Sequence, residues 1–137
     1  MILLDTCVLS EPLRSQPDPR VLAWLDNQAA ETLFLSSISC AELLFGVQRL
    51  PDGKRKSDLE PRVRRALALF DDRTLDFDRE AAEHLARIAA HTEKAGRKPT
   101  APDVWIAAIA AAHGFAVATR NIRHFEHTGV PLIDPWA

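Results

Sequence analysis

Met1-Ile2-Leu3-Leu4-Asp5-Thr6, the first segment of the chain, indicates the fold class. An apolar run over residues 1–4 ends directly in the carboxylate of Asp5, and a helical pattern begins at Thr6. In an open α/β sheet, ligands bind just outside the carboxyl ends of the strands. We therefore expect a strand over residues 1–4 that presents Asp5 as a candidate metal-binding or phosphate-handling group.

The composition is typical of a globular protein. The chain has 137 residues, 47% of them hydrophobic and 26% charged, which predicts one domain spanning residues 1–137. The net charge of −2 provides no global basic field, so contact with nucleic acid requires a local cluster of cations. The apolar runs at residues 1–4 and 104–112 are too short for a signal peptide or a membrane span, which predicts a cytoplasmic protein. Cys7 and Cys40 are expected to be free, buried thiols.

Strand and helix patterns alternate along the chain. Repeated βα units predict a parallel sheet of four to five strands covered by helices on both faces, which is a three-layer α/β/α domain. The helical pair between the second and third strands is expected to stand off the sheet as an arm. The expected strands are residues 1–4, 32–35, 75–77, 115–118 and 132–133. The expected helices are 6–13, 19–28 capped by Asp18, 38–50, 57–70 with a Ser57–Glu60 capping box, one capped by Asp78, 102–113 before Gly114, and a last turn at 121–126.

Three acids fall near strand ends or helix starts. Asp5 follows the first strand, Glu42 lies near the start of the helix after the second strand, and Asp103 opens the helix before the fourth. A parallel sheet brings Asp5, Glu42 and Asn121 to one edge, whereas topology alone does not place Asp103 there. Taken singly, each acid also fits a helix cap, since Ser39-x-x-Glu42 and Thr100-x-x-Asp103 both match a capping box.

Two observations favour a shared site over separate caps. The helix over residues 104–112 is apolar all round and therefore buried, so that Asp103 faces the sheet and requires a partner or a metal. Neither lysine nor arginine lies close in sequence to Asp5, Glu42 or Asp103. Converging acids raise one another's pKa, and Mg²⁺ or Mn²⁺ bound by oxygen ligands relieves the repulsion. Such a site suits phosphodiester hydrolysis: Asp5 and Asp103 would bind metal directly, Glu42 would act through water, and Thr6 and Asn121 would hold water or phosphate.

The ordered motifs resemble those of the PIN-domain ribonucleases, and most of all the VapC and FitB toxins of bacterial toxin–antitoxin pairs. They span essentially the whole chain. The motifs are Ile2-Leu3-Leu4-Asp5-Thr6, Ser36-x-x-Ser39-x-x-Glu42-Leu43-x-x-Gly46, Pro102-Asp103-x-x-Ile106-Ala107, Ala118-Thr119-Arg120-Asn121-x-x-x-Phe125, and the closing Pro131-Leu132-Ile133-Asp134-Pro135-Trp136.

The resemblance implies a PIN-like fold and a Mg²⁺-dependent endoribonuclease that is silenced by a cognate VapB-like antitoxin. It also implies a homodimer, and a heterotetramer or larger assembly with the antitoxin. Carried over by position, Asp5, Glu42 and Asp103 are the catalytic and metal-binding acids. The supporting residues are Thr6, Ser39, Thr119 and Asn121. One position departs from the family pattern: His124 stands where many relatives have an acid, and we expect it to be an exposed loop residue.

RNA must be contacted by local cations. Arg120 and Arg123 lie close in sequence to the site, and Arg14 and the run 54–56 on the expected arm are further candidates. Single-stranded loops are the expected target, since their bases splay and their phosphates can be approached. The apolar residues that remain could line a groove for an antitoxin helix or belong to the core: Leu9, Leu13, Val21, Leu22, Trp24, Leu25, Leu67 and Phe70.

Two other classes of protein compete with the nuclease. In a PIN-like binding module without catalytic activity, the acids would serve only as helix caps, and no Mn²⁺ would bind. A receiver domain of the response-regulator type also carries an acidic pocket. This chain lacks the paired acids near the first strand and the lysine after the last one that such a domain requires.

Overall fold

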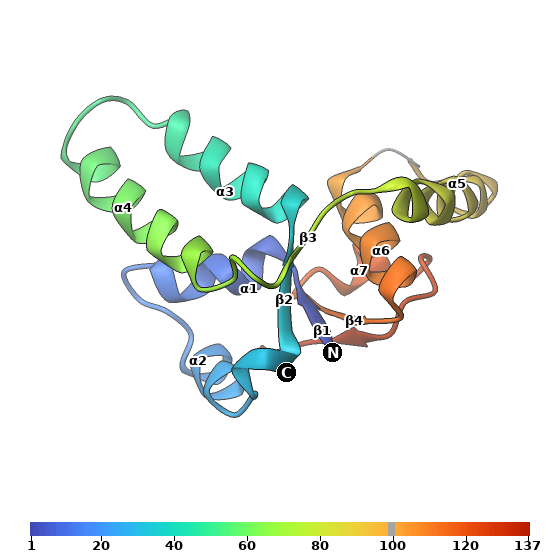
Figure 1. Ribbon diagram of the computed structural model, residues 1–137, viewed down its shortest axis with the longest axis horizontal. Coiled ribbons are helices and arrows are strands. Elements are labelled where there is room, and N and C mark those ends of the chain that lie inside the picture. Colours follow the sequence, from blue (N-terminus) through green and yellow to red (C-terminus); the bar gives the residue numbers. More distant parts are fainter. Residues whose placement is uncertain (99–100) are drawn as a thin grey trace.

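The fold is built on a parallel sheet, as the sequence predicts. The computed structural model describes residues 1–98 and 101–137. Five strands lie in the order β3-β2-β1-β4-β5, and every neighbouring pair is parallel (Figure 1). The strands are β1 (Ile2–Leu4), β2 (Leu33–Ser36), β3 (Thr74–Leu75), β4 (Ala116–Ala118) and β5 (Leu132–Ile133). The first strand of the chain is thus the central strand of the sheet.

Helices cover both faces of this sheet. They are α1 (Thr6–Ser10), α2 (Pro19–Asp26), α3 (Ser37–Gln48), α4 (Lys54–Ala68), α5 (Arg79–Lys94), α6 (Pro102–His113) and α7 (Ile122–Phe125). The expected helix 6–13 is divided between α1 and a 3-10 turn, Glu11–Leu13; a second 3-10 turn, Ala30–Thr32, precedes β2. Among the described residues, none of these helices is both long enough and apolar enough to cross a membrane.

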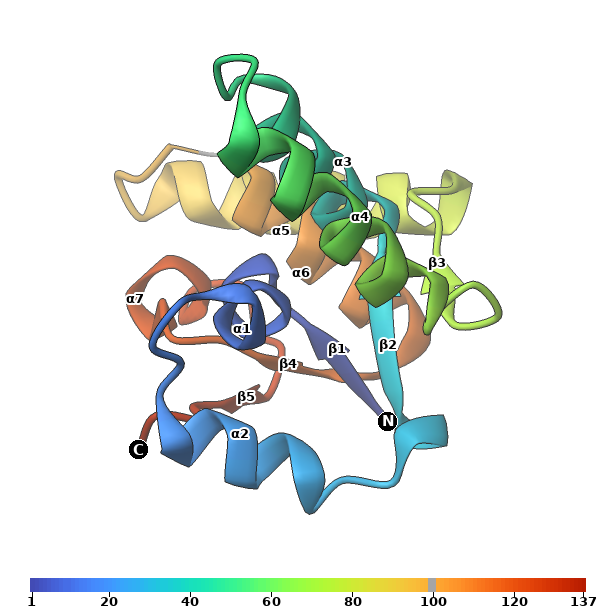
Figure 2. The same cartoon turned by 90° about the vertical axis from the view of Figure 1, so that its left-hand side faces the viewer.

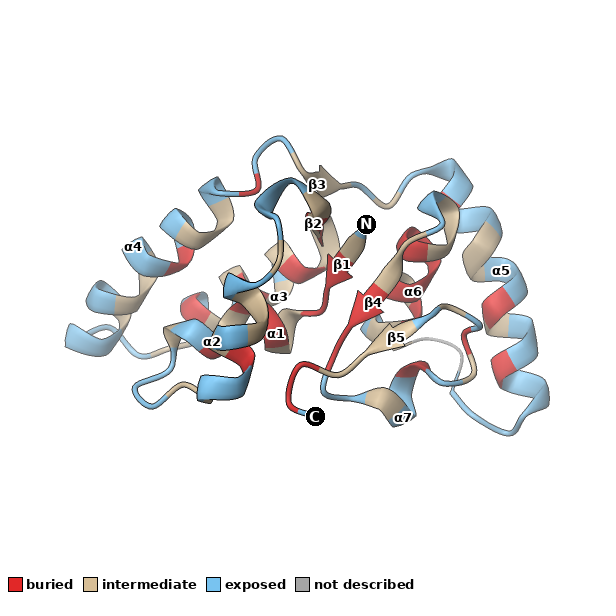
Figure 3. Ribbon diagram, turned by 90° about the horizontal axis from the view of Figure 1, so that it is seen from below, coloured by how far each residue is buried: buried red, intermediate tan, exposed pale blue. Residues whose placement is uncertain are grey.

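Side chains of the central strands β1 and β4 point alternately to the two faces of the sheet, which divides the core into two layers. Leu4 and Ala118 pack with residues of α1, α2, α3 and α4, whereas Leu3 and Val117 pack with residues of α5, α6 and α7. Successive residues of a strand point to opposite faces, so β1 and β4 serve both layers. The middle of α6 is completely buried, which confirms the prediction from its all-round apolar sequence (Figure 3).

The arm predicted between the second and third strands is present, formed by α3 and α4 (Figure 1). However, the Ser57–Glu60 capping box is wrong, because α4 already begins at Lys54. The residue before it, Gly53, has φ of 152°, a conformation that glycine adopts most easily. Pro61 consequently lies inside α4, where it removes one backbone donor.

The apolar residues assigned either to a groove or to the core belong mainly to the core. Leu9, Val21 and Phe70 are buried. Most of the others are partly buried against the same cluster: Leu13, Trp24, Leu25 and Leu67. Figure 2 shows α1 between the arm and α2, which is why so many apolar side chains are needed on this side of the sheet.

Candidate active site

The site lies where the strand order of the sheet reverses. The neighbours β1 and β4 are parallel, and the chain leaves them in opposite directions, toward β2 and β5. A crevice opens at such a switch point, beyond the carboxyl ends of the strands. Asp5 directly follows β1 and Thr119 directly follows β4, so the two side chains meet in this crevice.

Asp5 is the buried centre of the site, with 3% of its surface exposed. Its Oδ1 accepts a hydrogen bond from the Thr6 amide at 2.8 Å, and its Oδ2 accepts one from Thr119 Oγ1 at 2.7 Å. The Cys7 thiol lies 3.4 Å from Oδ2 and donates weakly. The cap role considered for Asp5 is therefore real, but a carboxylate has about four acceptor positions and can also bind a cation.

The pKa of Asp5 is raised above its ordinary value. Burial is the main cause, and the nearby Asp103 carboxylate adds to it, while the hydrogen bonds from Thr119, Thr6 and Cys7 oppose it. Burial and the same Asp5 charge raise the pKa of the Cys7 thiol to about 11. Negative charge is thus costly in this crevice, which favours any cation that enters it.

Glu42 reaches the site from α3. This helix is capped by Ser36, whose Oγ accepts from the Ser39 amide at 3.0 Å, so the capping box predicted for Ser39 and Glu42 is wrong. The Glu42 carboxylate instead accepts a hydrogen bond from Thr6 Oγ1 at 2.7 Å, and Ser39 Oγ lies 3.0 Å from the same hydroxyl. Thr6 therefore connects Glu42 with the backbone that carries Asp5.

Asp103 lies in the first turn of α6 and is half-buried. Burial raises its pKa, a contact with His124 opposes this, and the Glu42 charge raises it further. The charge of Asp103 thus acts on Asp5, and that of Glu42 acts on Asp103, although the three acids come from separate elements. The residue preceding α6 is Ala101, which makes no side-chain cap; the expected cap Thr100 and the end of the expected loop at Pro99 lie outside the described residues.

His124 is a site contact that the sequence prediction missed. We expected an exposed loop residue; the side chain is 62% exposed, but it lies on α7, and its Nδ1 is 2.8 Å from Asp103 Oδ2. The available signal was its position, three residues after Asn121 in the last motif. A histidine here can hold the Asp103 carboxylate in one orientation.

The remaining predicted site residues differ in how they contact the acids and the loop after β4. The backbone amide of Asn121 donates to Thr119 Oγ1 at 2.9 Å, which fixes the loop after β4. Arg123 lines a small cleft of about 250 Å³ together with Asp103. The Arg120 guanidinium lies over the Trp136 ring at 5.4 Å, so its charge is turned toward the C-terminal segment.

The donor set fits a hard divalent cation that keeps part of its water shell. Among residues 1–98 and 101–137, no three His, Cys, Asp or Glu side chains form a ready-made metal cage. In the same described part of the chain, neither lysine nor arginine forms an ion pair with Asp5, Glu42 or Asp103. Mg²⁺ binds proteins through one or two carboxylates and several waters, which matches acids that lie near one another without closing on one point.

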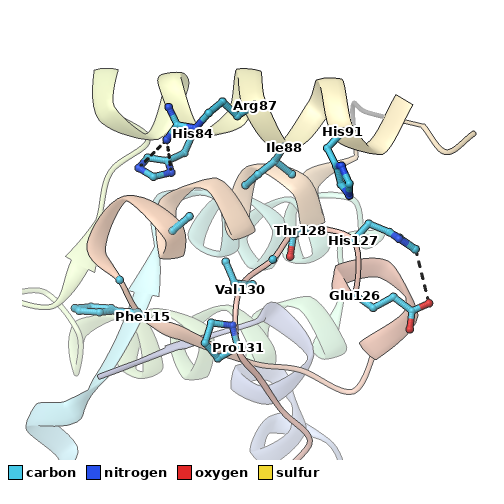
Figure 4. Close-up of a pocket in the computed structure, with 13 residues that line it drawn as sticks. His84, Arg87, Ile88, His91, Phe115, Glu126, His127, Thr128, Val130 and Pro131 are labelled. Carbon is cyan, nitrogen blue, oxygen red and sulfur yellow. Dashed lines mark hydrogen bonds and ion pairs between the residues drawn. The ribbon is translucent and has the colours of Figure 1, made fainter. Parts of the chain in front are cut away.

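Two larger clefts differ in their relation to these acids. One, of about 620 Å³, lies between the arm and the segment after α1 and includes Glu42 in its lining. The other, of about 720 Å³, lies among α5, the end of α6 and the loop before β5, and its lining contains none of the three acids (Figure 4). Only the first of the two is continuous with the candidate site.

The fold agrees with comparisons with known proteins. The sequence matches the PIN domain family over residues 2–131, and the chain belongs to that family. It is 45% identical to the plasmid stability protein StbB of Pseudomonas syringae pv. tomato and 44% identical to the toxin FitB of Neisseria gonorrhoeae, in each case over 99% of both chains.

Solved structures show the same likeness in three dimensions. FitAcB from Neisseria gonorrhoeae matches with a TM-score of 0.92 and 44% identity over 99% of both chains. A structure of FitAB bound to a DNA fragment matches with a TM-score of 0.93 and 43% identity, over 100% of this chain and 96% of that one. The parallel sheet and its helical layers are therefore the PIN fold.

Proposed function

We propose that this protein is the toxin of a type II toxin–antitoxin pair and a Mg²⁺- or Mn²⁺-dependent endoribonuclease acting in the cytoplasm. A VapB-like antitoxin would hold it inactive, in a heterotetramer or larger assembly built on a toxin homodimer. Support comes from relatives at 44% identity named as a VapC ribonuclease and as the toxin FitB. Solved neighbours described as DNA-bound VapBC and as a member of the VapBC family of toxin–antitoxin systems add to it.

One observation carries the nuclease proposal: Asp5, Glu42 and Asp103 come from three elements, yet they lie close enough for the charge of Asp103 to act on Asp5 and that of Glu42 to act on Asp103. Burial and repulsion from a neighbouring acid raise the pKa of both Asp5 and Asp103, and among the described residues no lysine or arginine forms an ion pair with them. Keeping charged carboxylates together in this way destabilises a fold unless a cation compensates. Acids arranged only to cap helices would not need to lie so close to one another.

Each residue of the candidate site has a proposed role that follows from its position. A divalent cation bound here lowers the pKa of a water and stabilises charge on phosphate oxygens. Asp5 and Asp103 would hold the ion, with Asp5 oriented by Thr119 and Asp103 by His124. Glu42, kept in place by the Thr6 hydroxyl, would accept a hydrogen bond from the attacking water. Ser39 and Asn121 would support these groups from the edge of the crevice.

The Asp5→Asn variant tests this proposal. Asparagine keeps the shape of the side chain and an acceptor for the Thr6 amide, but it removes the charge that binds a cation. We expect loss of Mg²⁺-dependent RNA cleavage, with a cooperative unfolding transition retained in urea. The matched control is Asp71→Asn, an exposed position outside the site, which should cleave like the wild type. Comparable cleavage by the Asp5 variant in added Mg²⁺ would refute the assignment.

A PIN-like binding module is the second candidate, and the cap that Asp5 forms on the Thr6 amide favours it. In that case the acids contribute only to stability. Calorimetry would detect no Mn²⁺ binding to the chelator-treated protein, and the unmodified chain would cleave no RNA with or without metal. Mn²⁺ binding that is lost in Asp5→Asn excludes this reading.

A further inference from the structure

The arm encloses a cleft that begins at the candidate site and leads away from it. Its lining comes from the segment after α1, from α3 and from α4, and it includes Glu42 at one end. Between Glu42 and Val47, which both line the cleft, α3 advances by about 7.5 Å at about 1.5 Å per residue, and the lining continues to Leu50 beyond the end of the helix. The volume of about 620 Å³ is therefore spread along the arm rather than confined to Glu42.

The two kinds of surface in this cleft are separated. Its apolar part comes from the facing sides of α3 and α4, through Leu43 and Val47 on one helix and Leu59 and Val63 on the other. Its charged part, apart from Glu42, consists of three arginines and one acid: Arg14, Arg55, Arg62 and Asp58. An apolar base with cations at the rim suits a polymer whose charges and flat apolar groups alternate.

Arg55 and Arg62 have no protein counter-ion in the part of the chain that the structure describes. Other cations of the same helix do: Lys56 lies 3.6 Å from Asp52, and Arg64 lies 3.8 Å from Glu60. Arg65 of this helix also forms no ion pair among the described residues, but it lies outside the cleft lining. Of the three arginines that line the cleft, Arg14 pairs with Glu11, so Arg55 and Arg62 are the unpaired ones. Guanidinium groups bind phosphate with directed hydrogen bonds, which makes this rim complementary to a polyphosphate backbone.

We propose that the arm cleft binds the single-stranded RNA that flanks the scissile phosphate, with Arg55 and Arg62 on its phosphates and its bases against the apolar residues of α3 and α4. This inference rests on the proposed function, because it assigns a path to the substrate of that same site. A single strand fits better than a duplex, since only unpaired bases turn away from the backbone to meet an apolar surface. Substrate held here is anchored beside Glu42.

The test compares two double variants that remove equal charge from the same helix. Arg55→Ala with Arg62→Ala removes the cations of the cleft; Arg64→Ala with Arg65→Ala, at positions outside the cleft lining, is the matched control. All four positions are exposed, and alanine favours helix, so both variants should fold, as urea unfolding will verify. The probe is a labelled single-stranded RNA in Ca²⁺, with cleavage measured in Mg²⁺.

We expect the cleft variant to bind the RNA at least about tenfold more weakly, with a salt dependence reduced by about 0.7 per lost phosphate contact. Its cleavage of the same RNA in Mg²⁺ should fall with the binding, through a raised KM. The control variant should change binding far less. Equal losses in both double variants, or no loss in either, would overturn the proposal.

Two other outcomes separate this inference from the function on which it rests. If the unmodified chain neither binds nor cleaves RNA, the proposed function fails, and this inference fails with it. If the unmodified chain cleaves RNA, and the cleft variant cleaves equally well but binds an antitoxin more weakly, the function stands. The cleft is then a protein-binding surface, and the RNA path proposed here is wrong.

Discussion

The Thr119→Val variant tests the electrostatics of the crevice most directly. Thr119 Oγ1 donates to Asp5 Oδ2 at 2.7 Å, and both residues are buried. Within residues 1–98 and 101–137, the carboxylate accepts from two other donors, the Thr6 amide and the Cys7 thiol. Hydrogen bonds to charged groups contribute about 1.5–3 kcal/mol and neutral ones about 0.5–1.5 kcal/mol. We therefore expect the free energy of unfolding to fall by about 1.5–3 kcal/mol where Asp5 is ionised, and by about 1 kcal/mol where it is protonated.

The direction of the pH dependence follows from the raised pKa of Asp5. Because the folded state holds this proton more tightly than the unfolded state, ionisation of Asp5 destabilises the fold progressively as the pH rises from the unfolded pKa through the folded one. Removing the Thr119 hydroxyl raises the folded pKa further. The deficit of the variant should therefore be smallest near pH 4, increase with pH, and level off above the folded pKa of the variant.

The assay is urea unfolding in the presence of a chelator across this pH range, comparing midpoints at constant slope. Thr92→Val is the matched control: Thr92 is equally buried, but its hydroxyl donates to the neutral Ile88 carbonyl at 2.7 Å, so its deficit should not vary with pH. A deficit of Thr119→Val that is constant across the range, or that grows toward acid pH, would refute the assignment of charge to Asp5.

Two further predictions concern Cys7, a partly buried thiol that contacts Asp5, and Glu11, a buried acid. At pH 8, a thiol with a pKa of about 11 is about one part in a thousand thiolate. Alkylation of Cys7, followed by peptide mass spectrometry, should therefore be about a hundredfold or more slower in the folded protein than in urea. Equal rates in the two states would contradict the shielding of this thiol. Glu11→Ala should lower the free energy of unfolding by about 1–3 kcal/mol, because the buried Glu11 carboxylate accepts a hydrogen bond from the Asp18 backbone amide at 2.9 Å. The control Glu31→Ala, at an exposed position, should change it by under about 0.5 kcal/mol. Similar losses for both variants in urea unfolding would contradict the role of Glu11.

Local patterns in the sequence predicted the elements well where a single signal controlled them. The helix expected over residues 102–113 matches α6 residue for residue, because Gly114 ends it in a left-handed conformation that glycine tolerates. The strand before Asp5 was equally clear. Free cysteines were also predicted correctly, although Cys7 and Cys40 are only partly buried.

The errors share a physical cause: one side chain can serve either a local or a distant partner. Ser57 and Glu60 have the spacing of a capping box, yet the glycine turn before Lys54 starts α4 a turn earlier. Glu42 has the same spacing from Ser39, but its carboxylate bonds to Thr6, 36 positions away in sequence. Periodicity cannot reveal such a partner, because the contact exists only after the sheet has assembled.

The candidate site shows the same limit. Placing acids at strand ends required only the expectation of a parallel sheet, and this holds for Asp5 and Glu42. The contact between Asp103 and His124 depends on how α6 and α7 pack. The apolar sequence of α6 drew attention to Asp103, whereas only the resemblance to a family drew attention to the position of His124. The paths of Arg120 and Arg123 likewise depend on the conformation of the loop after β4.

The central position of β1 in the sheet affects folding during synthesis on the ribosome. β1 is synthesised well before its neighbour β4, since Asp5 and Thr119 are separated by 114 positions in the sequence. Chains emerge from the N-terminus, and pairings between distant segments form slowly. The crevice therefore lacks both Asp103 and Thr119 until most of the chain has been made. A nascent chain would be unable to attack RNA near the ribosome that is producing it, and activity would begin only on completion of the sheet.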